Sequence, residues 1–184
     1  MLIRGFIRVG RFTAGTLSPT RRGTVMQVYI AHPAFTEGQT EFKERFIARL
    51  REHIGKLKDC GPITLIDPFH YAPDVEGSIE HKLASSREIK ETCLNLLDGC
   101  KLLIAVVDDN DTGTAFEAGY AYHMDIPIIL VSKGTCYSAN AMLLGSAHAR
   151  FDNVLDEFQL SLLAGLIEWH YLLLLGPRLV PGKD

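Results

Sequence analysis

The sequence has little that would tie it to a disulfide framework, a metal centre or a membrane. Its 184 residues hold four cysteines, no two of them spaced as C-x-x-C, and no His/Cys cluster has the spacing of zinc ligands. We therefore expect reduced thiols in a cytoplasmic protein without a metal. The richest apolar run, residues 160–175, is interrupted by Glu168 and His170, so it predicts a packed helix and no membrane partner.

Positive charge is also scarce outside the first residues. Residues 1–25 carry five arginines and no acid, whereas the remainder has 14 basic and 22 acidic residues, a net charge of −8. This acidity argues against a nucleic-acid partner, because such binding neutralises phosphates with Lys and Arg. We interpret residues 1–25 as a basic, disordered extension and residues 26–184 as one domain. A targeting peptide and an upstream translation start before Met26 are alternatives for the extension.

The order of apolar segments predicts one α/β domain. Short runs rich in β-forming residues predict strands at residues 28–31, 63–66, 102–107 and 127–131. Apolar residues at helical spacing predict helices near residues 39–58, 83–97 and 154–174, with a further helix capped by Thr114. Strands that alternate with helices favour parallel pairing through right-handed crossovers. The expected fold is a single doubly wound parallel sheet, a flavodoxin-like (Rossmann-like) three-layer sandwich.

The densest acidic segment follows the run 102–107, which has the composition of a central strand buried on both faces. In a flavodoxin-like sheet, ligands bind beyond the carboxyl ends of the first and third strands. That position predicts that Tyr29, near the end of the first strand, lies beside Glu117 and orients it through a hydrogen bond.

Glu117 is the candidate nucleophile of this segment. If Thr114 caps the helix, Glu117 falls in its first turn, where the helix N-terminus favours an anion. An ionised carboxylate can attack the anomeric carbon of a sugar and form a covalent glycosyl intermediate. Asp111, on a flexible loop, can protonate the leaving group, and Gly113 lets the backbone approach a substrate. The same residues also fit a structural alternative, a turn followed by a capping box of Thr114 and Glu117.

Residues 111–121, Asp-Thr-Gly-Thr-Ala-Phe-Glu-Ala-Gly-Tyr-Ala, resemble the signature of the nucleoside 2-deoxyribosyltransferase family. Segments 28–35, 94–107 and 140–143 resemble further parts of that family in the same order, so the resemblance covers roughly residues 26–152. Members transfer a 2-deoxyribosyl group between nucleobases through a glutamate nucleophile. The resemblance implies nucleosides and free nucleobases as partners, no cofactor, and a homo-oligomer whose active sites are shared between subunits.

The resemblance also assigns roles to individual residues. It implies Glu117 as the nucleophile, Asp111 as the aspartate that interacts with the base, and Tyr29 as the tyrosine that orients the nucleophile. Asn140 matches an asparagine that reaches into a neighbouring subunit's site and contacts the sugar. The further candidates for substrate binding are Gly113, Phe35, His32, Asp109, Met142 and Cys93.

Two positions depart from the family pattern. Cys93 stands where many members carry an aspartate that contacts the deoxyribose, so the resemblance implies altered recognition of the sugar; a free cysteine also fits a small core residue. His32 stands where relatives often have a small residue, so we expect a different pocket mouth. Phe35, Phe69 and His70 lie on loops at the ligand edge and fit either base binding or ordinary loop packing.

Three functions fit these residues. The first is 2-deoxyribosyl transfer in nucleoside salvage. The second is an N-glycosidase that hydrolyses nucleoside 5′-monophosphates, for which residues 85–87, Ser-Ser-Arg, offer a candidate phosphate site. The third is a non-catalytic nucleotide-binding module, which the fold alone does not exclude.

Overall fold

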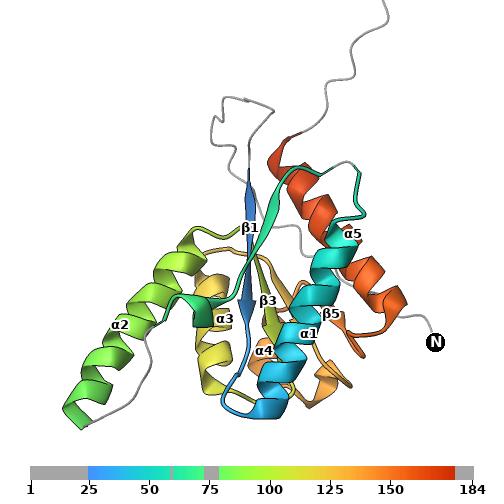
Figure 1. The fold of residues 1–184 in the computed structure, drawn as a ribbon. Helices are drawn as coiled ribbons and strands as arrows, with labels where there is room; N and C mark the ends of the chain where they lie inside the picture. The colour runs from blue at the N-terminus through green and yellow to red at the C-terminus, as the bar shows by residue number, and fades with distance from the viewer. Residues whose placement is uncertain (1–24, 59, 73–78, 177–184) are drawn as a thin grey trace, which may run out of the picture.

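The computed structural model describes residues 25–58, 60–72 and 79–176, which build a parallel sheet flanked by helices (Figure 1). The sheet has five strands in the order β2-β1-β3-β4-β5. This is the flavodoxin-like order, and it confirms the predicted fold class. The strands are β1 (Met26–Ala31), β2 (Ile63–Ile66), β3 (Leu102–Val106), β4 (Ile128–Val131) and β5 (Ala149–Phe151). The basic extension expected before Met26 lies outside the described residues except for Val25.

Five helices and two short 3₁₀ turns accompany the strands in the described ranges. The 3₁₀ turns cover Pro68–His70 and Cys136–Ser138. The helices are α1 (Glu37–Ile54), α2 (Ile79–Asp98), α3 (Thr112–His123), α4 (Ala141–Ser146) and α5 (Glu157–Leu174). No helix in these ranges combines the length and the apolar character needed to cross a bilayer.

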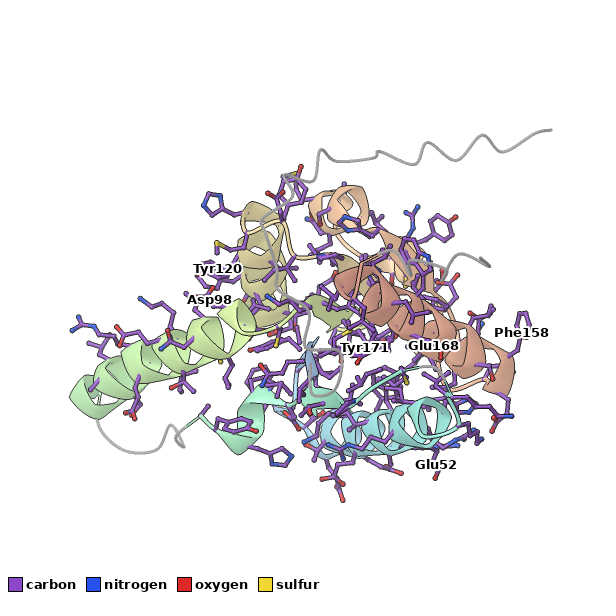
Figure 2. The ribbon with its side chains drawn as sticks, turned by 90° about the horizontal axis from the view of Figure 1, so that it is seen from above. Glu52, Asp98, Tyr120, Phe158, Glu168 and Tyr171 are labelled. Carbon is purple, nitrogen blue, oxygen red and sulfur yellow. The ribbon has the colours of Figure 1, made fainter. Side chains whose placement is uncertain are left out.

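The helices divide between the two faces of the sheet. Val28 and Ile30 belong to the core formed with α1 and α5, whereas Tyr29 and Ala31 pack on the side of α2, α3 and α4. This division follows from the alternation of side chains along a strand. Seen from above, α1 and α5 lie side by side and α2 lies on the other side of the sheet (Figure 2). Tyr29 therefore faces the layer that contains α3.

The strand register gathers polar residues at one edge. Tyr29 of β1 lies opposite Ile66 of β2 and Leu103 of β3. Because parallel strands end at the same edge, the residues that follow these three strands meet there. The first polar residues beyond the strands are His32, Asp67 and Asp108.

The prediction that Thr114 caps the helix at the start of α3 is wrong. Asp111, and not Thr114, is the N-cap of α3, because its carboxylate accepts a hydrogen bond from the backbone N–H of Thr114 at 2.6 Å. A carboxylate is a strong N-cap acceptor, and its charge also complements the helix dipole. The capping box lies instead at the start of α1, where Thr36 and Gln39 exchange side-chain and backbone hydrogen bonds.

Two neighbouring leucines of α5 provide a test of how this helix packs beside α1. Leu163 is fully buried, whereas Leu162 is 47% exposed. We expect Leu163→Ala to lower the free energy of unfolding by about 2–5 kcal/mol, because it leaves a cavity beside α1. Leu162→Ala, the matched control, should cost less than about 1 kcal/mol. Urea titrations measure both, and equal losses would contradict the packing of α5.

Candidate active site

The acidic residues directly after β3 have structural partners. Asp108 accepts hydrogen bonds from the Ser132 hydroxyl at 2.8 Å and the Lys133 backbone at 3.0 Å, which joins the ends of β3 and β4. Asp109 accepts one from the Gln39 amide at 3.1 Å, which ties this loop to the start of α1. Asp108 is thus held in the scaffold, while the exposed Asp109 stays a candidate for substrate contact.

Asp111 is fixed at the start of α3 instead of lying on a flexible loop. A Cβ atom at position 113 would lie 3.1 Å from Asp111 Oδ2, so Gly113 leaves room for the capping carboxylate. Since α3 begins at Thr112, Glu117 lies in the second turn of the helix. The expectation that the helix N-terminus keeps Glu117 ionised is therefore wrong, because that effect falls off within the first turn.

Glu117 extends from the inner side of α3 toward β1. The Tyr29 hydroxyl donates a hydrogen bond to Glu117 Oε1 at 2.6 Å, across 88 positions of sequence. The Cys93 thiol of α2 interacts electrostatically with both residues. Side chains of β1, α2 and α3 therefore meet at one carboxyl group.

The electrostatics of this trio follow from burial. Desolvation raises the pKa of Glu117 to about 7, although the hydrogen bonds of Tyr29 and Cys93 and the charge of His32 act in the opposite direction. The charge of Asp111 adds to the rise. Burial, with the charge of Glu117, also raises the pKa of the Tyr29 phenol and the Cys93 thiol. Both groups therefore stay protonated at neutral pH, where they can donate to Glu117.

A second cluster lies beyond the ends of β1 and β2. His32 is buried, with its Nε2 atom 3.0 Å from Asp67 Oδ1, and the Lys43 ammonium lies 3.1 Å from Asp67 Oδ2. The His32 ring stacks on Phe69 with the ring centroids 5.0 Å apart, and Phe35 meets Phe69 edge-on. Phe35 is 74% exposed, so it forms a rim of the site and not part of the core.

Sequence reasoning missed Gln39, Lys43 and Asp67. A signal existed for Asp67, which directly follows β2 and so had to lie at the same edge as His32. Lys43 follows Phe42 on the buried side of α1, where a lysine needs a partner. Among the described residues, no three His, Cys, Asp or Glu side chains are arranged to hold a metal ion.

Asn140 and Met142 lie at the start of α4. Asn140 caps this helix by accepting a hydrogen bond from the Met142 backbone at 2.8 Å, and Met142 is 83% exposed. In the described part of a single chain, neither side chain hydrogen-bonds Tyr29, Cys93 or Glu117. Their role in a neighbouring subunit's site stays a prediction.

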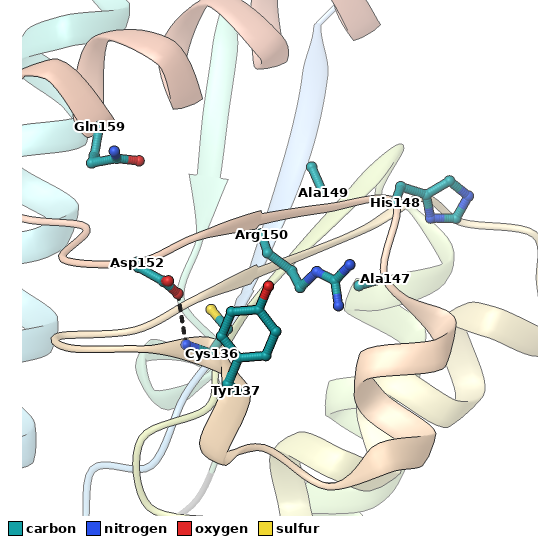
Figure 3. A pocket seen from close by; sticks show the side chains of 8 residues that line it. All are labelled: Cys136, Tyr137, Ala147, His148, Ala149, Arg150, Asp152 and Gln159. Carbon is teal, nitrogen blue, oxygen red and sulfur yellow. Dashed lines mark hydrogen bonds between the residues drawn. The ribbon is translucent and has the colours of Figure 1, made fainter. Parts of the chain in front are cut away.

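A separate pocket of about 400 Å³ lies along β5 (Figure 3). Asp152 at its wall accepts a hydrogen bond from the Cys136 backbone at 2.7 Å, as Figure 3 shows. Its lining contains neither Tyr29 nor Glu117, so it is not part of the candidate site. The residues that line it are Cys136, Tyr137, Ala147, His148, Ala149, Arg150, Asp152 and Gln159.

Comparisons with known proteins bear on the family and the fold of this chain. The family model described as nucleoside 2-deoxyribosyltransferase matches residues 28–157, well over half of the chain. A solved 2-deoxyribosyltransferase from Bacillus psychrosaccharolyticus is 28% identical, with 73% of this chain and 95% of that chain covered and a TM-score of 0.53. The search among curated proteins found no significant match.

Two other solved structures are more distant. A conserved protein from Enterococcus faecalis is 23% identical, with 65% of this chain and 70% of that chain covered and a TM-score of 0.49. A CMP N-glycosidase from Clostridium botulinum is 20% identical, with 74% and 96% covered and a TM-score of 0.48. Neither likeness bears on the activity of this chain.

The raised pKa of Glu117 predicts how stability depends on pH. The folded protein keeps this proton up to about pH 7, whereas a glutamate in the unfolded chain loses it near pH 4.5. Wild-type stability therefore falls as the pH rises through this window, and the loss is absent once Gln replaces Glu117. We therefore compare the free energy of unfolding of Glu117→Gln with that of wild type at two pH values. We expect this difference to increase in favour of the variant by about 2 kcal/mol from pH 5 to pH 8.5.

Urea unfolding at both pH values measures this gain. The exposed Glu44 of α1 gives the matched control, since Glu44→Gln should differ from wild type by the same amount at both pH values. A Glu117→Gln difference that does not change with pH would show that Glu117 titrates normally.

Proposed function

Because the chain belongs to the nucleoside 2-deoxyribosyltransferase family, we propose that it transfers a 2-deoxyribosyl group between nucleobases through a covalent ester on Glu117. The observation that carries this proposal is the 2.6 Å hydrogen bond from Tyr29 to Glu117. Tyr29 lies two residues before the end of β1, and Glu117 lies in the helix that follows β3, close to the edge at which a doubly wound sheet binds its ligands. Of the four carboxylates between Asp108 and Glu117, Glu117 is the one that accepts a hydrogen bond from β1.

In the first half-reaction, a Glu117 oxygen attacks the anomeric carbon as the N-glycosidic bond breaks and its electron pair leaves with the base. Tyr29 holds the carboxyl group in one orientation for this attack. The attack needs the ionised carboxylate, and the ester that forms is neutral. Burial therefore favours the intermediate, because it disfavours the charge that ester formation removes.

In the second half-reaction, the acceptor base attacks the same carbon and the Glu117 carboxylate leaves. The departing base gains a proton and the acceptor loses one, so a single carboxyl group can carry the proton between the two half-reactions. We assign this role to Asp111, whose charge acts on Glu117 and whose Oδ2 is fixed by α3.

The remaining candidates would form the walls of the substrate site. Cys93, beside Glu117, would face the sugar and offers a thiol in place of a carboxylate, so we expect weaker selection of 2-deoxyribose over ribose. Phe35 and Phe69 would pack against the base, next to Asp109. Asn140 and Met142 from a neighbouring subunit would complete the site, which makes the active form a homo-oligomer.

Removal of the nucleophile gives the first test. We expect Glu117→Ala to lower the rate of base exchange by at least about 1,000-fold, as the loss of a covalent nucleophile does. Glu44→Gln should retain full activity, because Glu44 lies exposed on α1. Initial rates are measured by chromatography with a panel of 2′-deoxynucleosides, each with a second free base. A Glu117→Ala variant that still exchanges bases would rule out this mechanism.

The fate of the intermediate gives the second test. The same panel and a set of nucleoside 5′-monophosphates are incubated with and without acceptor base. Transfer predicts a new nucleoside that forms only when the base is added. If free sugar or sugar phosphate accumulates at an equal rate without the base, the protein is an N-glycosidase in which water captures the intermediate.

A further inference from the structure

The outward side of α5 carries an apolar surface that the rest of the described chain leaves exposed. Its four large side chains are exposed by about half or more: Phe158 by 66%, Leu162 by 47%, Trp169 by 54% and Leu173 by 52%. Ser161 and Gly165, which lie between them in sequence, are exposed as well. The large residues and Gly165 follow one another at intervals of three or four positions, so they share one side of the helix. We call these six residues the α5 stripe, and Figure 2 shows Phe158 at its outer end.

This helix has more apolar surface than packing within the chain requires. Its inner side already supplies five buried residues to the core: Leu160, Leu163, Ala164, Ile167 and Tyr171. A helix at the surface of a protein needs one apolar side, whereas a helix that is apolar on both sides is normally covered on both. The α5 stripe carries no charged residue and lies opposite that core side. It therefore indicates a surface that binds another molecule.

Gly165 indicates what kind of molecule fits. It lies near the middle of α5, where glycine costs about 1 kcal/mol relative to alanine. Apart from its neighbours in the helix, no atom of the described residues lies within 4 Å of the place that a Cβ atom would take there. Packing within the chain thus gives no reason for a glycine. A second helix gives one, because the side chains at the contact set how closely two helix axes approach.

The size of the α5 stripe matches that of a protein–protein interface. Its four large side chains present about 400 Å² of exposed apolar surface, since a large aromatic side chain alone offers roughly 150–250 Å². A standard interface covers about 800 Å² on each partner, and roughly 60% of that area is apolar. The stripe therefore supplies most of the apolar area that a stable pair of subunits needs.

We propose that the α5 stripe is an interface between two copies of this chain, in which α5 packs antiparallel against α5 of the partner about a two-fold axis. The core shared by α1 and α5 lies on the opposite face of the sheet from the core that contains α3 and α4. This interface is therefore separate from the one expected at Asn140 and Met142, and it does not depend on the proposed function.

A second copy suits the stripe because the stripe complements itself. When two antiparallel helices cross at Gly165, each residue faces the partner residue that lies equally far from Gly165 on the other side. Trp169 then faces the partner's Ser161, so a large side chain meets a small one. Phe158 faces the partner's Leu172, so two apolar side chains meet. The two-fold axis forms each contact twice, as an isologous interface requires.

Analytical ultracentrifugation of the full chain tests the interface. Gly165→Lys places a charged side chain into open space in the separate chain, so it should fold, as circular dichroism checks, while it blocks the approach of a second helix. We expect its mass to be at most half that of wild type at the same micromolar concentration. The matched control Ala48→Lys adds the same charge to the exposed side of α1 and should keep the wild-type mass. A wild type that stays a single chain, or a Gly165→Lys variant of unchanged mass, overturns the proposal.

Fluorescence gives a second measurement that needs no variant. Trp169 is the one tryptophan of the chain, so its emission reports on the stripe directly. As the wild-type concentration rises, we expect the emission to shift to shorter wavelength and quenching by acrylamide to fall several-fold, because the partner covers the indole. Gly165→Lys should stay fully quenched at every concentration.

The concentration dependence also separates this pair from coverage by the chain itself. If Trp169 is shielded equally at all concentrations while the mass is that of one chain, a terminal segment of the same chain covers the stripe and the proposal is wrong. The small cost expected for Leu162→Ala applies to the separate chain, so that urea titration belongs at the low end of the concentration range. Equal exposure of Trp169 to acrylamide at every concentration also overturns the proposal.

Discussion

The carboxyl group of the half-buried Glu117 is the constraint on which the candidate site depends. Burial raises its pKa to about 7, so its charged form needs hydrogen-bond donors that compensate for the lost water. The Tyr29 hydroxyl of β1 is such a donor, and it lies 88 positions from Glu117 in sequence. The sheet must therefore form before the carboxylate is stabilised. The site depends on the strand register, because a shift of β1 by one residue would turn Tyr29 to the opposite face of the sheet.

The part of this arrangement that could be predicted from sequence is the part set by periodicity. The apolar run after Lys101 indicated a central strand, and the alternation of strands and helices indicated a parallel sheet with its ligand edge after that strand. From this order alone, Tyr29 and Glu117 were expected to meet. The reason is general: strand order and side-chain alternation fix which residues share an edge and a face, and both can be read from the spacing of apolar residues.

The features that escaped prediction depend on contacts distant in sequence. β5 has three residues, with an exposed position before its buried end, and it is a strand only because it pairs with β4. Asp111 and Thr114 both suit an N-cap, and the choice depends on backbone geometry that composition does not reveal. The contact of Asp67 with Lys43 spans 24 positions and that with His32 spans 35, so no local sequence pattern predicts these contacts. Their rotamers and burial arise only in the assembled layer.

Paired charges offer a reason why a buried carboxylate is tolerable in so small a domain. A lone buried anion would be neutralised by proton uptake. Asp67 has the Lys43 ammonium 3.1 Å from one oxygen and the His32 ring 3.0 Å from the other, and these contacts hold its pKa well below its usual range. Glu117 instead accepts a hydrogen bond from the neutral Tyr29 phenol, and burial raises its pKa to about 7. The two carboxyl groups therefore differ in kind: Asp67 is fixed as a carboxylate, whereas Glu117 can change its protonation state near neutral pH, as proton-transfer chemistry requires.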